Sequence, residues 1–203
     1  RKNSKGFLNM DTHGKRIILA SNSPRRRELL SGLDIDFTVD TGTSFVERYS
    51  SDTPHVKVPE LMSEGKSLGF HRELDEDEIL VTSDTMVLCG TEILGKPRDR
   101  ADAVRMLRLL SGREHQVITA VTIRDRHRRK TFSVTSDVYF KNLSDSEIDY
   151  YIDNFKPFDK AGAYGIQEWI GYVGITRLDG SFYNVMGFPT QRFYEELQVF
   201  MNR

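Results

Sequence analysis

Three consecutive arginines, Arg25 to Arg27, stand in the segment SNSPRRRELL, directly after a short apolar run. Ser23 is a good N-cap and Pro24 suits the first position of a helix, so we expect a helix to begin here. The first turn of a helix presents free N–H groups and partial positive charge, and each cation there costs about 0.3–1 kcal/mol. The arginines therefore occupy the least favourable part of this predicted helix for positive charge.

This segment has two interpretations. The arginines can form a basic turn that faces solvent, where exposed charges cost little. Alternatively, the hydroxyl groups of Ser21 and Ser23 and the helix N-terminus bind an anion. The guanidinium groups of Arg25 and Arg26 would then share that anion, because a guanidinium binds two phosphate oxygens at once. The second interpretation predicts a phosphate site.

Asp84 lies inside the segment LVTSDTMVL, which is otherwise rich in apolar residues and predicts a buried strand. A buried ionised carboxylate costs several kcal/mol unless it is paired or binds a metal. One interpretation is a structural aspartate that is hydrogen-bonded to the backbone at a bulge. The functional interpretation is a metal ligand or a general base for water.

Two further segments add candidate residues. ILGKP places Lys96 between a glycine and a proline just after a predicted strand, where it is either an exposed lysine or a side chain aimed at a site. The glycine-rich DKAGAYGIQ is either a plain loop or a segment that approaches a ligand closely, and Gln167 in it could bind the edge of a base. Together these features suit a polyphosphate with a divalent cation. No GxxxxGK[ST] motif is present, which argues against a P-loop.

Composition narrows the classes of partner and of protein that remain possible. The net charge of −1 gives no overall field that favours nucleic acid or a membrane surface, so we expect neither partner. No apolar run approaches the roughly 18 residues of a membrane span. The single cysteine, Cys89, excludes a disulfide framework, fits a cytoplasmic setting and is expected in the core.

The elements that must position these residues follow from periodicity and capping signals. The pattern predicts strands at 17–20, 35–40, 115–123 and 131–140, and three strands within 78–97, with a break between the first two and a tight Gly90-Thr91 turn before the third. It predicts helices from Ser23 onward and at 59–71, 100–110, 144–155 and 190–201, and a hairpin at Asp179-Gly180. Such interleaving predicts an α/β fold with a mixed sheet flanked by helices. We expect one domain over residues 16–203, preceded by a disordered leader over 1–15.

The motifs also match a known family. LASNSPRRRELL, SDTMV, ILGKP, DKAGAYGIQ and GFP resemble, in order and spacing, the Maf family of nucleoside triphosphate pyrophosphatases, from Arg16 to the C-terminus. The resemblance implies an elongated twisted mixed β-sheet with two lobes around a central cleft, similar to inosine triphosphate pyrophosphatases, and a homodimer. It implies hydrolysis of a nucleoside triphosphate to the monophosphate and pyrophosphate with Mg2+ or Mn2+.

Individual roles follow from the same resemblance. It implies catalytic roles for Asp84, Lys66 and Lys96, and metal ligation by Glu47 and Asp84. Substrate-binding positions map onto Ser21, Ser23, Arg25, Arg26, Thr85 and Gln167, of which Arg25, Thr85 and Gln167 match positions that set base choice. Arg27 has no matching role, so we expect it to face solvent.

The combination SPRR, SDT and GIQ is similar to the branch of the family that acts on dTTP and UTP. Two alternatives remain: the same reaction on 7-methyl-GTP or CTP, and a nucleotide-binding regulator of cell division without turnover. The chain departs from the family pattern at Val46, where an aspartate is usual, and at Glu168, where a glycine is usual.

Overall fold

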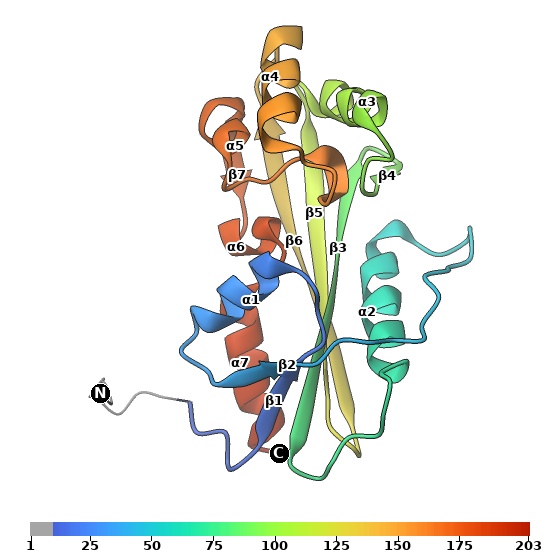
Figure 1. Ribbon diagram of the computed structural model, residues 1–203, viewed down its shortest axis with the longest axis vertical. Coiled ribbons are helices and arrows are strands. Elements are labelled where there is room, and N and C mark those ends of the chain that lie inside the picture. The colour runs from blue at the N-terminus through green and yellow to red at the C-terminus, as the bar shows by residue number, and fades with distance from the viewer. Residues whose placement is uncertain (1–9) are drawn as a thin grey trace.

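The computed structural model describes residues 10–203, in which seven strands form one mixed sheet (Figure 1). The strands are β1 (Arg16–Leu19), β2 (Phe37–Val39), β3 (Glu78–Cys89), β4 (Glu92–Leu94), β5 (Glu114–Arg124), β6 (Arg129–Phe140) and β7 (Ile175–Asp179). Their order is β2-β1-β3-β5-β6-β7, with β4 paired to β3 beside this path. The pairs β1–β2 and β1–β3 are parallel and the others antiparallel, which confirms the expected mixed sheet.

Helices lie on both faces and at one end of the sheet. They are α1 (Pro24–Ser31), α2 (Val58–Leu68), α3 (Arg100–Leu110), α4 (Asp145–Phe155), α5 (Trp169–Gly174), α6 (Phe182–Met186) and α7 (Thr190–Met201), with 3-10 turns at His55–Lys57 and Ala161–Ala163. Figure 1 shows α2 on one side of the long strands and α1 and α7 on the other, while α3, α4 and α5 gather at the upper end. No helix among residues 10–203 has the length and apolar content to cross a membrane.

Two large apolar clusters give the molecule two lobes. One cluster packs α3, α4 and the glycine-rich segment against the upper ends of the strands, with Leu107 and Tyr151 fully buried. The other packs α1, α7 and β1 around Phe188 and Phe193, which are also fully buried. Since β3, β5 and β6 run through both lobes, the middle of these strands is held rigidly between the two cores (Figure 1).

Helices α1 and α4 begin at the caps that the sequence predicts. The Ser23 hydroxyl accepts the N–H of Arg26, and Pro24 occupies the first turn of α1. At α4 both hydrogen bonds of the capping box between Ser144 and Glu147 are present. These local bonds satisfy N–H groups that a helix leaves free, so they determine where each helix starts.

The break expected within 78–89 is wrong. Glu78–Cys89 is one uninterrupted strand, and Asp84 pairs with Ala120 in a continuous antiparallel register, so there is no bulge at this aspartate. Backbone amides form the ladder whatever the side chain is, and the polar side chain of Asp84 points into a cleft instead of a core. Cys89, at the end of the same strand, is buried as expected, and burial raises the pKa of its thiol.

The hairpin expected at Asp179-Gly180 is also wrong. Gly180 has a positive φ of 136°, and the chain then turns into α6 instead of a returning strand. Ser181 caps α6 by accepting the N–H of Asn184. The buried Asn184 amide donates to the carbonyls of Val117 and Val134, and so anchors the short helix on the sheet.

The leader expected over residues 1–15 lies mostly outside the described residues, which begin at Met10. Met10 packs against the lower apolar cluster, and His13 Nε2 lies 3.0 Å from Oδ1 of Asn202. Lys15 donates to the carbonyl of Glu76 at 2.7 Å. Residues 10–15 therefore contact the domain, while the leader over 1–9 stays a prediction.

An ion pair between the buried Glu78 and the partly exposed Arg72 lies at the lower end of the sheet. Both carboxylate oxygens of Glu78 accept hydrogen bonds from Arg72, at 2.7 and 2.8 Å, and the backbone N–H of Asp75 donates to the same carboxylate. The Glu78 side chain is only 2% exposed. The Arg72 guanidinium lowers the pKa of Glu78 to about 2, so the carboxylate stays charged in the folded protein.

Glu78→Gln should lower the free energy of unfolding at pH 7 by about 1.5–3 kcal/mol, because it removes the charge from the two hydrogen bonds that Arg72 donates to the buried carboxylate. The pKa of Glu78 is lower in the folded than in the unfolded chain, so the stabilisation is complete above about pH 4.3 and is lost as the pH falls toward 2. Urea unfolding at pH 7 and pH 3.5 measures both effects. Glu73→Gln, at a side chain that is 94% exposed, is the matched control and should change stability by less than about 0.5 kcal/mol. An equal loss for the two variants would contradict the assignment.

Candidate active site

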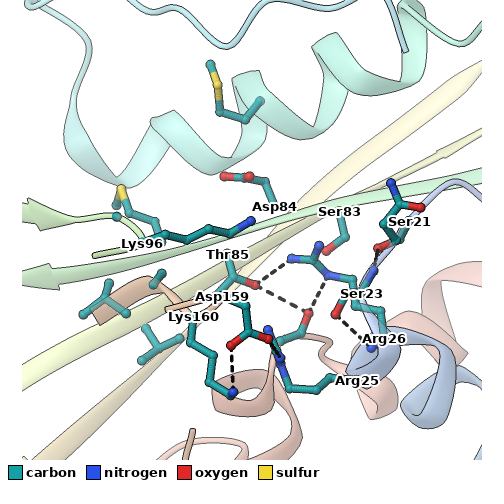
Figure 2. A pocket seen from close by; sticks show the side chains of 18 of the residues that line it. Ser21, Ser23, Arg25, Arg26, Ser83, Asp84, Thr85, Lys96, Asp159 and Lys160 are labelled. Atoms are coloured by element: carbon teal, nitrogen blue, oxygen red, sulfur yellow. Dashed lines mark hydrogen bonds and ion pairs between the residues drawn. The ribbon is translucent and has the colours of Figure 1, made fainter. Parts of the chain in front are cut away.

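A cleft of about 700 Å³ opens between the two lobes, over the middle of β3 (Figure 2). Its walls come from the β1–α1 loop, the loop at 41–49, α2, the end of β4, and the segments 159–167 and 185–187. Every residue that the sequence marked as a candidate lines this cleft: Ser21, Ser23, Arg25, Arg26, Glu47, Lys66, Asp84, Thr85, Lys96 and Gln167. The fold therefore brings together candidate side chains from six separate segments.

The β1–α1 loop forms one wall. Ser21 Oγ accepts the N–H of Ser23 at 3.1 Å, and Ser23 Oγ accepts the N–H of Arg26 at 3.4 Å. Each hydroxyl accepts within the loop and still has a proton to donate to a ligand. The N-terminus of α1 therefore faces the cleft with its hydroxyl and N–H groups arranged as an anion site.

Arg26 crosses from α1 to the sheet. Its Nε donates to the carbonyl of Gly187 at 3.0 Å, and its Nη2 donates to Thr85 Oγ1 at 3.0 Å. Among the described residues it has no carboxylate partner within ion-pair distance. Burial lowers its pKa to about 10, so the group is still charged at pH 7. A desolvated cation without a counter-ion attracts a buried anion strongly.

Thr85 provides one of the hydrogen-bond acceptors of Arg26. Its hydroxyl lies 3.0 Å from the hydroxyl of Thr119 and accepts from Arg26. These contacts of Thr85 Oγ1 connect β3 with β5 and α1. They do not test a role of Thr85 in base selection, which stays a prediction.

Arg25 leaves the helix on another side and joins the two lobes. Its Nη1 lies 3.1 Å from Oδ2 of Asp159, and Oδ1 of the same carboxylate accepts from Lys160 Nζ at 2.9 Å (Figure 2). Asp159 and Lys160 are not among the sequence candidates, although they are the first two residues of the glycine-rich DKAGAYGIQ. Arg27 is exposed and does not line the cleft, as expected.

Lys66 lies between two carboxylates. Its Nζ is 2.8 Å from Asp84 Oδ1 and 3.2 Å from Glu47 Oε1. Helix α2 packs on β3 and so places Lys66 above Asp84, while the loop at 41–49 carries Glu47 to the same point. Two carboxylates from distant segments thus converge on a single positive charge.

This pair of carboxylates fits a hard divalent cation. Oxygen ligands suit Mg2+ and Mn2+, and Mg2+ typically takes one or two carboxylates together with substrate phosphates and water. Within residues 10–203 no group of three or more acidic, histidine or cysteine side chains could hold an ion by itself. Val46 is exposed and supplies no oxygen ligand from its side chain. Glu47 and Asp84 therefore suit a metal whose remaining ligands come from a phosphate and water.

Lys96 is an unpaired cation at the mouth of the cleft. It follows β4, is exposed, and makes no hydrogen bond or ion pair with any described residue. In Figure 2 its side chain extends along β3 toward Asp84. Its ammonium is therefore available to a ligand without first breaking a contact.

The glycine-rich segment forms the upper wall. The N–H of Gly162 donates to the carbonyl of Gly95 at 3.1 Å, which ties the segment to the end of β4. Gly165 leaves no room for a Cβ, which would meet Glu168 Oε1 at 2.6 Å. Gln167 Oε1 is buried without a hydrogen-bond partner among the described residues. Such an acceptor costs free energy unless a ligand supplies a donor.

Comparison with known proteins places this chain in a family. The family model described as Maf-like protein matches residues 16–200. The chain is 48% identical over 190 residues to the dTTP/UTP pyrophosphatase of Bacteroides thetaiotaomicron, covering 94% of this chain and 97% of that protein. It is 49% identical over 185 residues to the dTTP/UTP pyrophosphatase of Parabacteroides distasonis, covering 91% and 96%.

Solved structures give weaker similarities. A HAM1 protein from Coxiella burnetii has 14% identity and a TM-score of 0.38, and the match covers 62% of this chain and 73% of that one. A nucleoside-triphosphatase, or dITP/XTP pyrophosphatase, from Mycobacterium abscessus has 11% identity and a TM-score of 0.42, covering 89% and 93%. The family model and the relatives confirm the resemblance inferred from the motifs, and the chain belongs to the Maf-like protein family.

Proposed function

We propose that this protein is a nucleoside triphosphate pyrophosphatase that hydrolyses dTTP and UTP to the monophosphate and pyrophosphate. The observation that carries the proposal is the cleft in which a partly buried carboxylate, Asp84, faces a set of cations from both lobes. The two relatives named above, each matched over more than 90% of its length, carry the name dTTP/UTP pyrophosphatase, which supports the same substrates here.

The cations bind the triphosphate. Arg26 and Lys96 are unpaired among the described residues and take phosphate oxygens directly. Arg25 and Lys66 exchange carboxylate partners for phosphate oxygens, and Ser21 and Ser23 donate their hydroxyl protons to the same group. Positioning and charge neutralisation supply most of the rate enhancement in phosphoryl chemistry.

Asp84 acts on the attacking water. Its carboxylate accepts a proton from water as the oxygen attacks the α-phosphorus, opposite the bond to the bridging oxygen. That bond breaks, and pyrophosphate leaves with the electron pair. The charge that develops on the leaving group is stabilised by Arg26, Lys66 and Lys96, which the fold holds in place before the reaction.

Glu47 and Asp84 are the residues that would hold the divalent cation, Mg2+ or Mn2+. When bound, the cation polarises phosphate oxygens and neutralises part of their charge. In the structure Lys66 pairs with the same two carboxylates.

Gln167 binds the base. Its buried, unpaired Oε1 suits the N3–H of uracil or thymine, and its Nε2 can donate to a neighbouring carbonyl of the base. Hydrolysis of 7-methyl-GTP or CTP is the alternative within the same chemistry. A panel of triphosphates assayed for pyrophosphate release with Mg2+ and with Mn2+ separates these substrates.

A nucleotide-binding regulator without turnover is the alternative from another class. Tight binding of UTP without pyrophosphate release would favour it. The homodimer and the cytoplasmic location expected from the sequence stay predictions. Sedimentation and cell fractionation, respectively, measure them.

Asp84→Asn should lower kcat for UTP at least about 100-fold, since general bases contribute on the order of 10²–10⁴ to the rate. Binding of UTP in the presence of Ca2+ should be largely retained, because the arginines and lysines are intact and the carbonyl oxygen of the asparagine can still bind the ion. Calorimetry and a pyrophosphate-release assay measure the two quantities. Asp179→Asn, at an exposed aspartate that ends β7, should leave both unchanged. Near-normal turnover of Asp84→Asn would show that Asp84 is not the base.

Inorganic pyrophosphate should raise the melting temperature, because it binds the folded cleft and not the unfolded chain. At 100 times its dissociation constant it adds about 2.7 kcal/mol, or roughly 5–10 °C for a domain of this size. Lys96→Gln should reduce the shift by about half or more, without changing the melting temperature of the free protein. Lys130→Gln, at an exposed lysine on β6 outside the cleft, is the control. An unchanged melting temperature with pyrophosphate would refute the anion site.

Lys66→Met should bind Mn2+ more tightly than the wild type in the absence of nucleotide, since the ammonium competes for Glu47 and Asp84. Even in bulk water a unit charge 4 Å away contributes about 1 kcal/mol per unit charge, so a divalent ion should gain tenfold or more. Titration calorimetry with Mn2+ alone measures the constants. Lys130→Met should match the wild type. Weaker binding to Lys66→Met would show that the ion does not use these carboxylates.

A further inference from the structure

Glu168 is held by two partners beside the base-binding segment. The Tyr151 hydroxyl donates to Glu168 Oε1 at 2.9 Å, and Lys160 Nζ lies 3.4 Å from the same oxygen. The Glu168 side chain is 19% exposed, so its charge is partly shielded from water. The carboxylate therefore keeps one position relative to α4 and the glycine-rich segment.

The same tyrosine holds the start of the turn that carries Gln167. The Tyr151 oxygen accepts the N–H of Gly165 at 2.9 Å, and the N–H of Glu168 donates to the carbonyl of Gly165 at 3.0 Å. Gln167 thus lies in a four-residue turn that is fixed at both ends. Tyr151 itself is fully buried, so the turn is tied to the core of the upper lobe.

The carboxylate lies near the donor end of the glutamine. The position of a Cβ on Gly165 would be 2.6 Å from Glu168 Oε1 and 3.1 Å from Gln167 Nε2, so both atoms border the same point. A carboxylate oxygen there can accept a hydrogen bond from the NH2 group but has no proton to donate to the carbonyl oxygen, so it favours the NH2 group on its side. The other end of the amide, Oε1, is the buried atom without a partner.

We propose that Glu168 and Tyr151 are positioning residues that set the orientation of the Gln167 carboxamide, and thereby select bases with an N3–H over cytosine. The inference rests on the proposed function and adds the physical origin of its base preference.

The chemistry of the bases explains why orientation matters. Uracil and thymine present an N3–H donor beside a carbonyl acceptor, which matches a carboxamide that offers Oε1 and Nε2 in that order. Cytosine presents an N3 acceptor beside an amino donor, the reverse order. A carboxamide rotated by half a turn would fit cytosine equally well. Gln167 discriminates between these bases only if its surroundings prevent that rotation.

The test compares UTP with CTP on the same variants. Glu168→Gln keeps the size and an acceptor for Tyr151 but removes the charge, and Tyr151→Phe removes the hydroxyl alone. We expect the ratio of kcat/KM for UTP over CTP to fall about tenfold in each, the factor for one hydrogen bond of ordinary net strength. Glu195→Gln on the exposed face of α7 and Tyr172→Phe, at a tyrosine that is 84% exposed, are matched controls and should keep the wild-type ratio.

Dissociation constants for UTP and CTP with Ca2+, measured by calorimetry, give the same ratio without turnover. A wild type that prefers UTP in binding but releases no pyrophosphate would refute the proposed function and leave the orientation to be judged from these constants. The inference is overturned if the wild type has no preference between UTP and CTP. It is also overturned if both variants keep the wild-type ratio, which includes an equal loss of affinity for the two nucleotides. Should Glu168→Gln fail to fold by circular dichroism, Tyr151→Phe decides.

Discussion

The guanidinium of Arg26 is the constraint around which the cleft is arranged. It is desolvated, it lacks a carboxylate partner among residues 10–203, and it is held by one carbonyl and one hydroxyl. Keeping a charge in such a place costs several kcal/mol, so the surrounding structure must supply that stability. The apolar packing of α1 and of Phe188 against the lower core holds both ends of the arginine's contacts in place. A bound anion would recover part of the cost, which links the stability of the free protein to the affinity of the site.

Local signals predicted much of the fold. Helices α3 and α7 match the expected residues, and the caps at Ser23 and Ser144 place two further helix starts. These elements depend on contacts between residues three or four positions apart, which a sequence displays directly. The break expected at Asp84 is wrong because a polar side chain does not interrupt strand pairing, since the ladder needs only the backbone. The hairpin at Gly180 was wrong because the partner of the following segment, through Asn184, is the face of the sheet.

The same distinction between local signals and contacts of distant segments applies to the site. The motifs named the residues of the cleft, but not which of them are paired. The contact of Lys66 with Asp84 depends on how α2 packs on β3, and that of Arg25 with Asp159 spans 134 positions of the chain. Neither leaves a periodic signal. Asp159 and Lys160 were missed for that reason, since a carboxylate beside a lysine is most often a solvated surface pair.

The pairing of charges in the free cleft has a consequence for binding energy. Lys66 is neutralised by Glu47 and Asp84, Arg25 by Asp159, and Lys160 by Asp159 and Glu168. A triphosphate bound as proposed therefore gains the full attraction of Arg26 and Lys96 but must replace existing partners at Arg25 and Lys66. This exchange weakens binding of the substrate and of pyrophosphate in the ground state. Contacts that strengthen only as the leaving group gains charge raise kcat. A cleft whose cations already have partners thus favours turnover over tight retention of its product.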